Sequence, residues 1–68
     1  MILASKNLKE YLRIADISHA DFAKRIGFDT ATVSQVLNGK EEPSKNFIEQ
    51  VILKTDMKFD SAFEVYEK

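Results

Sequence analysis

No cysteine occurs among the 68 residues, which excludes a disulfide framework and a cysteine-ligated zinc site as sources of stability. Two glycines and one proline are too few for a collagen-like or a proline-rich disordered chain. No apolar run approaches the roughly 20 residues that span a bilayer, and residues 1–4 are too short for the apolar core of a signal peptide. We therefore expect a cytoplasmic protein that does not bind a membrane.

The chain also lacks the strong excess of positive charge that is typical of nucleic-acid-binding domains, because ten Lys and Arg residues oppose eleven Asp and Glu residues. These charges are unevenly distributed. Six cations and four anions give residues 1–40 a net charge of +2, whereas four cations and seven anions give residues 41–68 a net charge of −3. Any anionic partner is therefore expected to bind the first forty residues.

The apolar residues, 44% of the chain, recur at helical spacing, which suits one small domain over residues 1–68. Hydroxyl and carboxylate side chains stand where helix caps are expected, and Gly27 stands where a helix can end in a left-handed conformation. We predict a compact all-α fold of five helices without a strand. The first is capped by Ser5 and ends near Asp16, the second covers about 18–26 with Ser18 as its cap, the third covers about 30–37 after Asp29, the fourth follows Ser44, and the last begins near Asp60 and includes Phe63 with Val65 or Tyr66.

Residues 19–38 have the spacing of a helix-turn-helix. A small residue at Ala23 lets the second helix cross closely, and Gly27 supplies a positive φ in the turn. Apolar residues after the turn anchor the following helix, so that its other face stays free. Seven positions agree with this pattern, namely Phe22, Ala23, Ile26, Gly27, Phe28, Val33 and Val36.

The segment FAKRIGFDTATVSQVLNGK at residues 22–40, followed by Pro43 and Ser44, resembles the signature of the lambda-repressor-like family, which includes phage repressors, Cro proteins and Xre-type regulators. The resemblance covers about residues 8–63. It implies a five-helix DNA-binding domain with its helix-turn-helix at about 18–37, in which the third helix enters the major groove and the second crosses the backbone. It also implies a small sequence-specific transcriptional regulator of the repressor or Cro kind, from a phage or another mobile element, that binds a palindromic operator in double-stranded DNA.

On the family's pattern, the side chains that face the bases lie on one side of the third helix and are Thr30, Ala31, Ser34 and Gln35. The long amide of Gln35 suits a bidentate bond to adenine N6 and N7, and Ala31 suits contact with a thymine methyl group. The resemblance places DNA phosphates against His19, Asn38, Lys40 and the amides near Ser44 and Lys45. Without the resemblance, the same Thr, Ser and Gln side chains indicate only a solvated helix face.

Two apolar residues stand where many relatives carry an ion pair. Leu12 replaces an arginine in the first helix and Leu37 replaces a glutamate at the end of the third, and we expect the two leucines to touch in the core. Asp29 lies where a neutral cap often stands close to a phosphate, and two glutamates at 41–42 replace a commonly basic loop. This acidic character leaves open a second hypothesis, a helix-turn-helix module that binds protein, such as an antirepressor or an antitoxin.

A single helix of eight residues reads few base pairs, whereas two related by a dyad read half-sites about 34 Å apart, so we expect a homodimer on DNA. The candidate dimer surface contains Phe59, Phe63, Val65 and Tyr66, and the alternative is that Phe59 and Phe63 only close the core of the monomer. The sequence contains no nucleophile–base pair and no glycine-rich phosphate loop, and its lone histidine has no second histidine or cysteine to share a metal. We therefore expect no enzymatic activity, no cofactor and no metal site.

Overall fold

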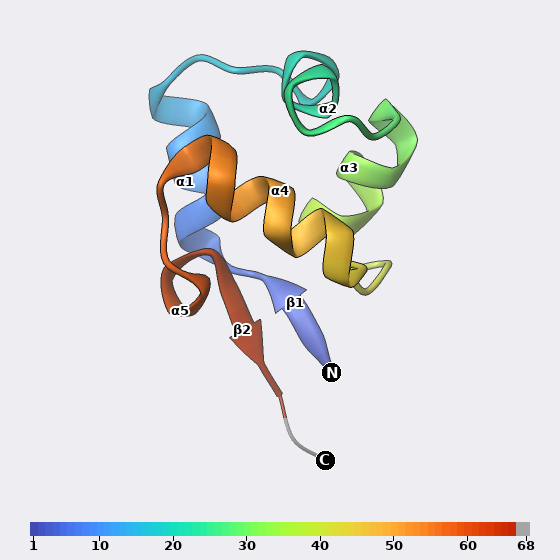
Figure 1. Ribbon diagram of the computed structural model, residues 1–68, viewed down its shortest axis with the longest axis vertical. Helices are drawn as coiled ribbons and strands as arrows, with labels where there is room; N and C mark the ends of the chain where they lie inside the picture. The colour runs from blue at the N-terminus through green and yellow to red at the C-terminus, as the bar shows by residue number, and fades with distance from the viewer. Residues whose placement is uncertain (67–68) are drawn as a thin grey trace.

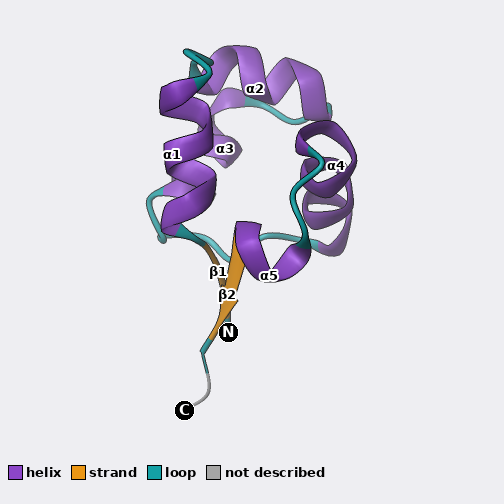
Figure 2. Cartoon of the chain, turned by 90° about the vertical axis from the view of Figure 1, so that its left-hand side faces the viewer, coloured by secondary structure: helices purple, strands orange, loops and turns teal. Residues whose placement is uncertain are grey.

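The structure is a computed structural model that describes residues 1–66. Within this part of the chain, five helices surround an apolar core, and a two-stranded ribbon extends from them with the N-terminus at its far end (Figures 1 and 2). In chain order the elements are β1 (Ile2–Ala4), α1 (Lys6–Ile14), α2 (His19–Ile26), α3 (Thr30–Leu37), α4 (Lys45–Thr55), α5 (Phe59–Ala62) and β2 (Phe63–Val65).

The four longer helices begin at the side-chain caps that the sequence predicts. Each capping oxygen accepts the backbone N–H three residues further on, Ser5 from Leu8, Ser18 from Asp21, Asp29 from Thr32 and Ser44 from Phe47. These bonds satisfy amides that the first turn of a helix leaves unpaired. α2 ends at Gly27, whose φ is +79°, which confirms the predicted left-handed end.

The prediction of a fold without strands is wrong. β1 and β2 pair antiparallel in the register Ile2–Val65, Leu3–Glu64 and Ala4–Phe63. α5 ends at Ala62, so Phe63 and Val65 belong to a strand and not to the last helix. A strand of three residues is too short for an alternating pattern to stand out, and its partner lies about 60 residues away, beyond any local window of the sequence.

The core draws buried side chains from all five helices and from β2. Its members are Leu8, Leu12, Phe22, Ala23, Ile26, Val33, Val36, Leu37, Phe47, Val51, Ala62 and Phe63. Leu12 and Leu37 are 3% and 2% exposed, so both belong to the core, and their direct contact stays a prediction. The rings of Phe28 and Phe47 meet edge to face with their centroids 5.0 Å apart, which fastens α4 to the turn before α3.

Two of the four residues that were expected at a dimer surface belong to the monomer instead. Phe63 is 2% exposed, and Phe59 is half-buried and stacks on it with ring centroids 5.6 Å apart. Phe63 therefore lies in the core of the monomer and Phe59 packs against that core. Val65 and Tyr66 remain exposed.

Ser5 connects the first helix to the C-terminal segment. This residue is 3% exposed, and its N–H donates to the carbonyl of Ala62 at 2.8 Å. Its hydroxyl donates to the carbonyl of Ser61 while accepting the N–H of Leu8. One serine therefore caps α1 and holds α5 against it.

Candidate nucleic-acid interface

The turn between α2 and α3 consists of Gly27, Phe28 and Asp29. The N–H groups of Gly27 and Phe28 both donate to the carbonyl of Ala23 at 2.9 Å, which closes the end of α2. A Cβ placed on Gly27 would meet no atom within 4 Å. The turn therefore needs glycine for its positive φ and not for lack of space.

α3 has one face in the core and the other toward solvent. The buried face consists of Val33, Val36 and Leu37, none of them more than 2% exposed. The exposed face carries Thr30, Ala31 and Gln35. Three of the four predicted base-reading residues are thus exposed to solvent, while the fourth, Ser34, is half-buried.

Ser34 lies beside His19, the first residue of α2. The imidazole Nδ1 of His19 and the hydroxyl oxygen of Ser34 are 2.8 Å apart, and both residues are half-buried. The two stand 15 residues apart in the chain, and the sequence had suggested separate roles for them, phosphate binding and base reading. Their hydrogen bond joins the start of α2 to the middle of α3.

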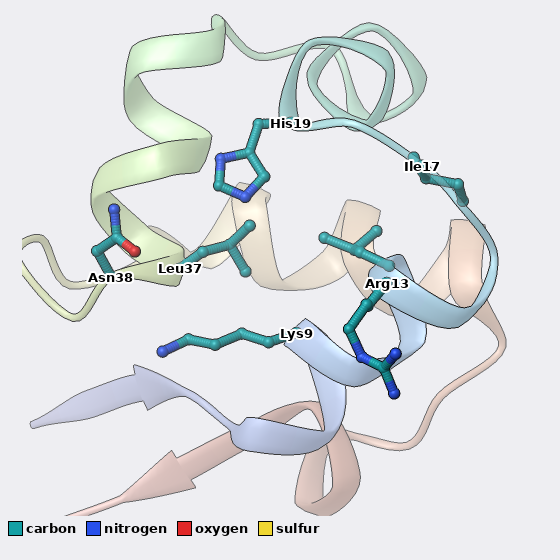
Figure 3. Close-up of a pocket in the computed structure, with 7 residues that line it drawn as sticks. Lys9, Arg13, Ile17, His19, Leu37 and Asn38 are labelled. Atoms are coloured by element: carbon teal, nitrogen blue, oxygen red, sulfur yellow. The ribbon is translucent and has the colours of Figure 1, made fainter.

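A pocket of about 240 Å³ lies between α1, the start of α2 and the end of α3 (Figure 3). Its lining consists of Lys9, Leu12, Arg13, Ile17, His19, Leu37 and Asn38. The buried part of this lining is apolar, and the exposed part is basic or polar. The pocket unites two predicted phosphate ligands, His19 and Asn38, with two cations from α1, so it suits an anion.

Lys9 and Arg13 are site residues that the sequence did not single out. Their spacing of four places them on one face of α1, but only the fold brings that face to α2 and α3. Glu10 accepts from Arg13 at 2.8 and 3.2 Å, and this hydrogen bond lowers the pKa of Glu10 and raises the pKa of Arg13. Lys9 takes part in no ion pair among the described residues, so its ammonium can bind an anion in the pocket without breaking such a pair.

The other predicted phosphate ligands lie outside this pocket. Lys40 is exposed in the loop after α3, and its N–H donates to the carbonyl of Gln35 at 2.9 Å. Ser44 caps α4 and Lys45 is the first residue of that helix, both of them exposed. The structure thus divides the predicted phosphate ligands into two groups, one around the pocket and one after α3.

The acidic loop after α3 is tied to the N-terminal strand. The carboxylate of Glu42 accepts the backbone N–H of Ile2 at 2.8 Å. This bond satisfies a backbone donor on the edge of β1 that does not face β2. Glu42 therefore has a structural role that its place in an acidic loop does not predict.

Asp29 keeps its negative charge at the start of α3. The hydroxyl of Thr32 donates to this carboxylate at 2.6 Å and, together with the capped backbone N–H, lowers the pKa of Asp29. An ionised carboxylate at this place is favoured by the helix dipole. It also repels any phosphate that comes within about 10 Å, which limits how the start of α3 can approach a DNA strand.

Among residues 1–66, no group of three or more His, Cys, Asp or Glu side chains is arranged to hold a metal ion. No helix in the same range is both long enough and apolar enough to cross a bilayer.

A family model described as helix-turn-helix matches residues 8–60 of the chain. The match covers 53 of the 68 residues, and it includes most of α1, all of α2, α3 and α4, and every residue that lines the pocket. A comparison with curated proteins found no match, and a comparison with solved structures found none either.

Proposed function

Because the chain belongs to the helix-turn-helix family of lambda-repressor-like DNA-binding regulators, we propose that it is a sequence-specific repressor of the Cro kind that reads DNA with α3. The observation that supports this most directly is the division of α3 into a fully buried face and an exposed face of short polar side chains. Eight residues at 1.5 Å each give a rod of roughly 12 Å, close to the width of a major groove.

The exposed face of α3 supplies side chains for base recognition. Gln35 is the only long amide on it and would bind adenine through N6 and N7. Ala31, one turn earlier, would contact a thymine methyl group, and the hydroxyls of Thr30 and Ser34 would bond to bases or to nearby phosphates. Sequence discrimination is therefore expected to depend chiefly on Gln35.

Backbone binding is divided between two places. Around the pocket, His19, Asn38 and Lys9 would hold one phosphate, with the ammonium of Lys9 as the charge that is not already paired. After α3, Lys40, Ser44 and Lys45 would hold phosphates through exposed cations and the amides at the start of α4. The proposed contacts to the DNA backbone therefore come from residues that precede α3 in the chain and from residues that follow it.

The repressor is proposed to bind a palindromic operator as a homodimer. With Phe59 and Phe63 taken up by the monomer core, the remaining candidates for the dimer surface are Val65, 60% exposed, and Tyr66, 48% exposed. Both lie on the ribbon, whose other strand has its Ile2 N–H satisfied by Glu42. A dimer formed through the β2 side of the ribbon would leave α3 of each copy free.

Selection from a randomised pool of DNA duplexes, followed by fluorescence anisotropy over a series of salt concentrations, tests the proposal. We expect a recurrent binding site and a steep linear fall of log affinity with log salt, because each neutralised phosphate releases a counterion. A matched non-specific duplex is expected to bind at least about a thousandfold more weakly. Absence of both the site and the salt dependence would contradict DNA reading and would favour the protein-binding module.

A further inference from the structure

The hydrogen bond between His19 and Ser34 gives the histidine a role beyond phosphate binding. We propose that His19 is a positioning residue that sets the base preference of α3, by deciding whether the hydroxyl of Ser34 donates to DNA or accepts from it. This inference rests on the proposed function, since it concerns the same DNA-reading helix. It adds that the preferred base at one position changes when His19 is protonated.

The geometry gives the two ring nitrogens of His19 different surroundings. Nδ1 lies 2.8 Å from the hydroxyl oxygen of Ser34, and the other ring nitrogen points into the pocket (Figure 3). The charged groups that line this pocket with His19 are Lys9 and Arg13 of α1, and Asn38 adds a neutral amide from the end of α3. A DNA phosphate in the pocket is thus placed to accept from Nε2, as the proposed function requires.

When the imidazole is neutral, a phosphate on Nε2 fixes the proton there, and Nδ1 is left as an acceptor. The hydroxyl of Ser34 then donates its one proton to Nδ1. Only its lone pairs remain for DNA, so Ser34 favours a base that presents a donor in the major groove. The amino groups N6 of adenine and N4 of cytosine are the donors of this kind.

When the imidazole is protonated, both ring nitrogens donate. Nδ1–H then donates to the oxygen of Ser34, and the hydroxyl proton of Ser34 is released to point toward DNA. It now favours an acceptor, such as O6 or N7 of guanine or O4 of thymine. The added charge also strengthens phosphate binding on any sequence, so overall affinity does not report on Ser34, whereas the preference between bases does.

The composition of the chain makes pH a selective probe of this pair. His19 is the only histidine, and histidine is the one side chain whose ordinary titration falls between pH 5 and 8. Asp29, the acidic group closest to the start of α3, has a lowered pKa and stays ionised throughout this interval. The α-amino group of Met1 can also titrate in this interval, so a change in base preference is assigned to His19 only where it disappears in a variant that lacks the imidazole.

The experiment selects binding sites from one randomised duplex pool at pH 5.5 and at pH 8.0 and then measures both sites by anisotropy at both pH values. Ser34→Ala identifies the base pair that Ser34 reads, because discrimination there is lost at both pH values. At this pair we expect the ratio of affinities for an acceptor base over a donor base to rise at pH 5.5 by roughly 2- to 12-fold, the range for one hydrogen bond.

His19→Phe removes one proposed phosphate contact, so it is expected to weaken binding of all duplexes alike and to abolish the change of preference with pH. His19→Gln, which retains a polar side chain, is expected to abolish the change of preference as well. Lys24→Gln, which removes an exposed charge from the same helix, is the matched control and should behave as the parent does. Circular dichroism at both pH values checks that the fold is intact.

A preference that is the same at both pH values, or one that still shifts in His19→Phe, would overturn the inference while leaving DNA reading in place. Failure to bind any site at either pH would instead overturn the proposed function itself.

Discussion

Leu37→Glu places a carboxylate at a buried position of the pocket lining, whereas the cations of that lining, Lys9 and Arg13, are exposed. Leu37 is 2% exposed and Leu12 is 3% exposed, and both belong to the same buried cluster. A buried charge whose partner is missing costs about 3–5 kcal/mol. For a chain of this size, each kcal/mol lowers Tm by about 4–8 °C, so the substitution is expected to lower Tm by about 12–40 °C or to unfold the protein at room temperature.

The double variant Leu12→Arg with Leu37→Glu supplies the carboxylate with a cationic partner and should recover part of the lost free energy of unfolding. Leu53→Glu is the matched control, because it makes the same change on α4 at a leucine that is 68% exposed. Leu53→Glu should change the free energy of unfolding by no more than about 0.5 kcal/mol. Urea unfolding followed by circular dichroism gives the free energy of unfolding of the parent, the single variant, the double variant and the control.

The pH dependence of Leu37→Glu provides an independent check. Burial raises the pKa of the new carboxyl in the folded state above its unfolded value of about 4.3. The folded state therefore binds the proton more tightly, and the loss of stability relative to the parent should shrink as the pH falls toward 4 and grow as it rises. Equal damage from the single and double variants, or a single variant as stable as Leu53→Glu, would refute this account of the core.

Other substitutions separate base reading, backbone binding, turn geometry and assembly. Gln35→Ala should weaken binding to the preferred site by about 1–3 kcal/mol and leave binding to non-specific DNA nearly unchanged. Lys40→Ala should weaken binding to both kinds of DNA and lower the slope of log affinity against log salt by about 1. Unchanged binding of the preferred site by Gln35→Ala would mean that α3 does not read the bases. Gly27→Ala should cost about 1–2 kcal/mol in urea unfolding through its left-handed conformation alone, since the added methyl group meets no atom, and a neutral result would contradict the need for glycine. Sedimentation should show two chains on an operator duplex and one chain per duplex for Val65→Lys, and a parent that stays monomeric on this DNA would remove the dimer.

Much of the helical framework could be predicted because its signals are local. Ser18 and Asp29 cap helices through bonds to residues three positions away, and Gly27 ends a helix through its own φ, so each feature lies within a few letters of sequence. The exposed face of α3 can be predicted in the same way, because the helical spacing of its apolar residues identifies the buried face and leaves the other residues exposed. Local periodicity and capping are sufficient for elements of this kind.

The features that escaped prediction all depend on segments that are distant in the chain. The ribbon needs residues about 60 positions apart to pair, and a three-residue strand carries almost no pattern of its own. Lys9 becomes a candidate ligand only when α1 packs against α2 and α3 and forms the pocket. The bond between His19 and Ser34 likewise depends on the crossing of two helices, which the sequence predicts in kind but not in atomic detail.

The pairing of the chain's two ends has a consequence for the order in which the protein folds. Contacts among α1, α2, α3 and α4 join segments that are near in sequence, whereas the ribbon closes a loop of about 60 residues and has a larger entropic cost of closure. The ribbon should therefore form after the helices have assembled and should open before they separate. Because Ser5 takes its partners from Ser61 and Ala62, the bonds of Ser5 to the C-terminal segment belong to this late step, and the final docking of α1 depends on residues that a ribosome makes 56 or more positions later.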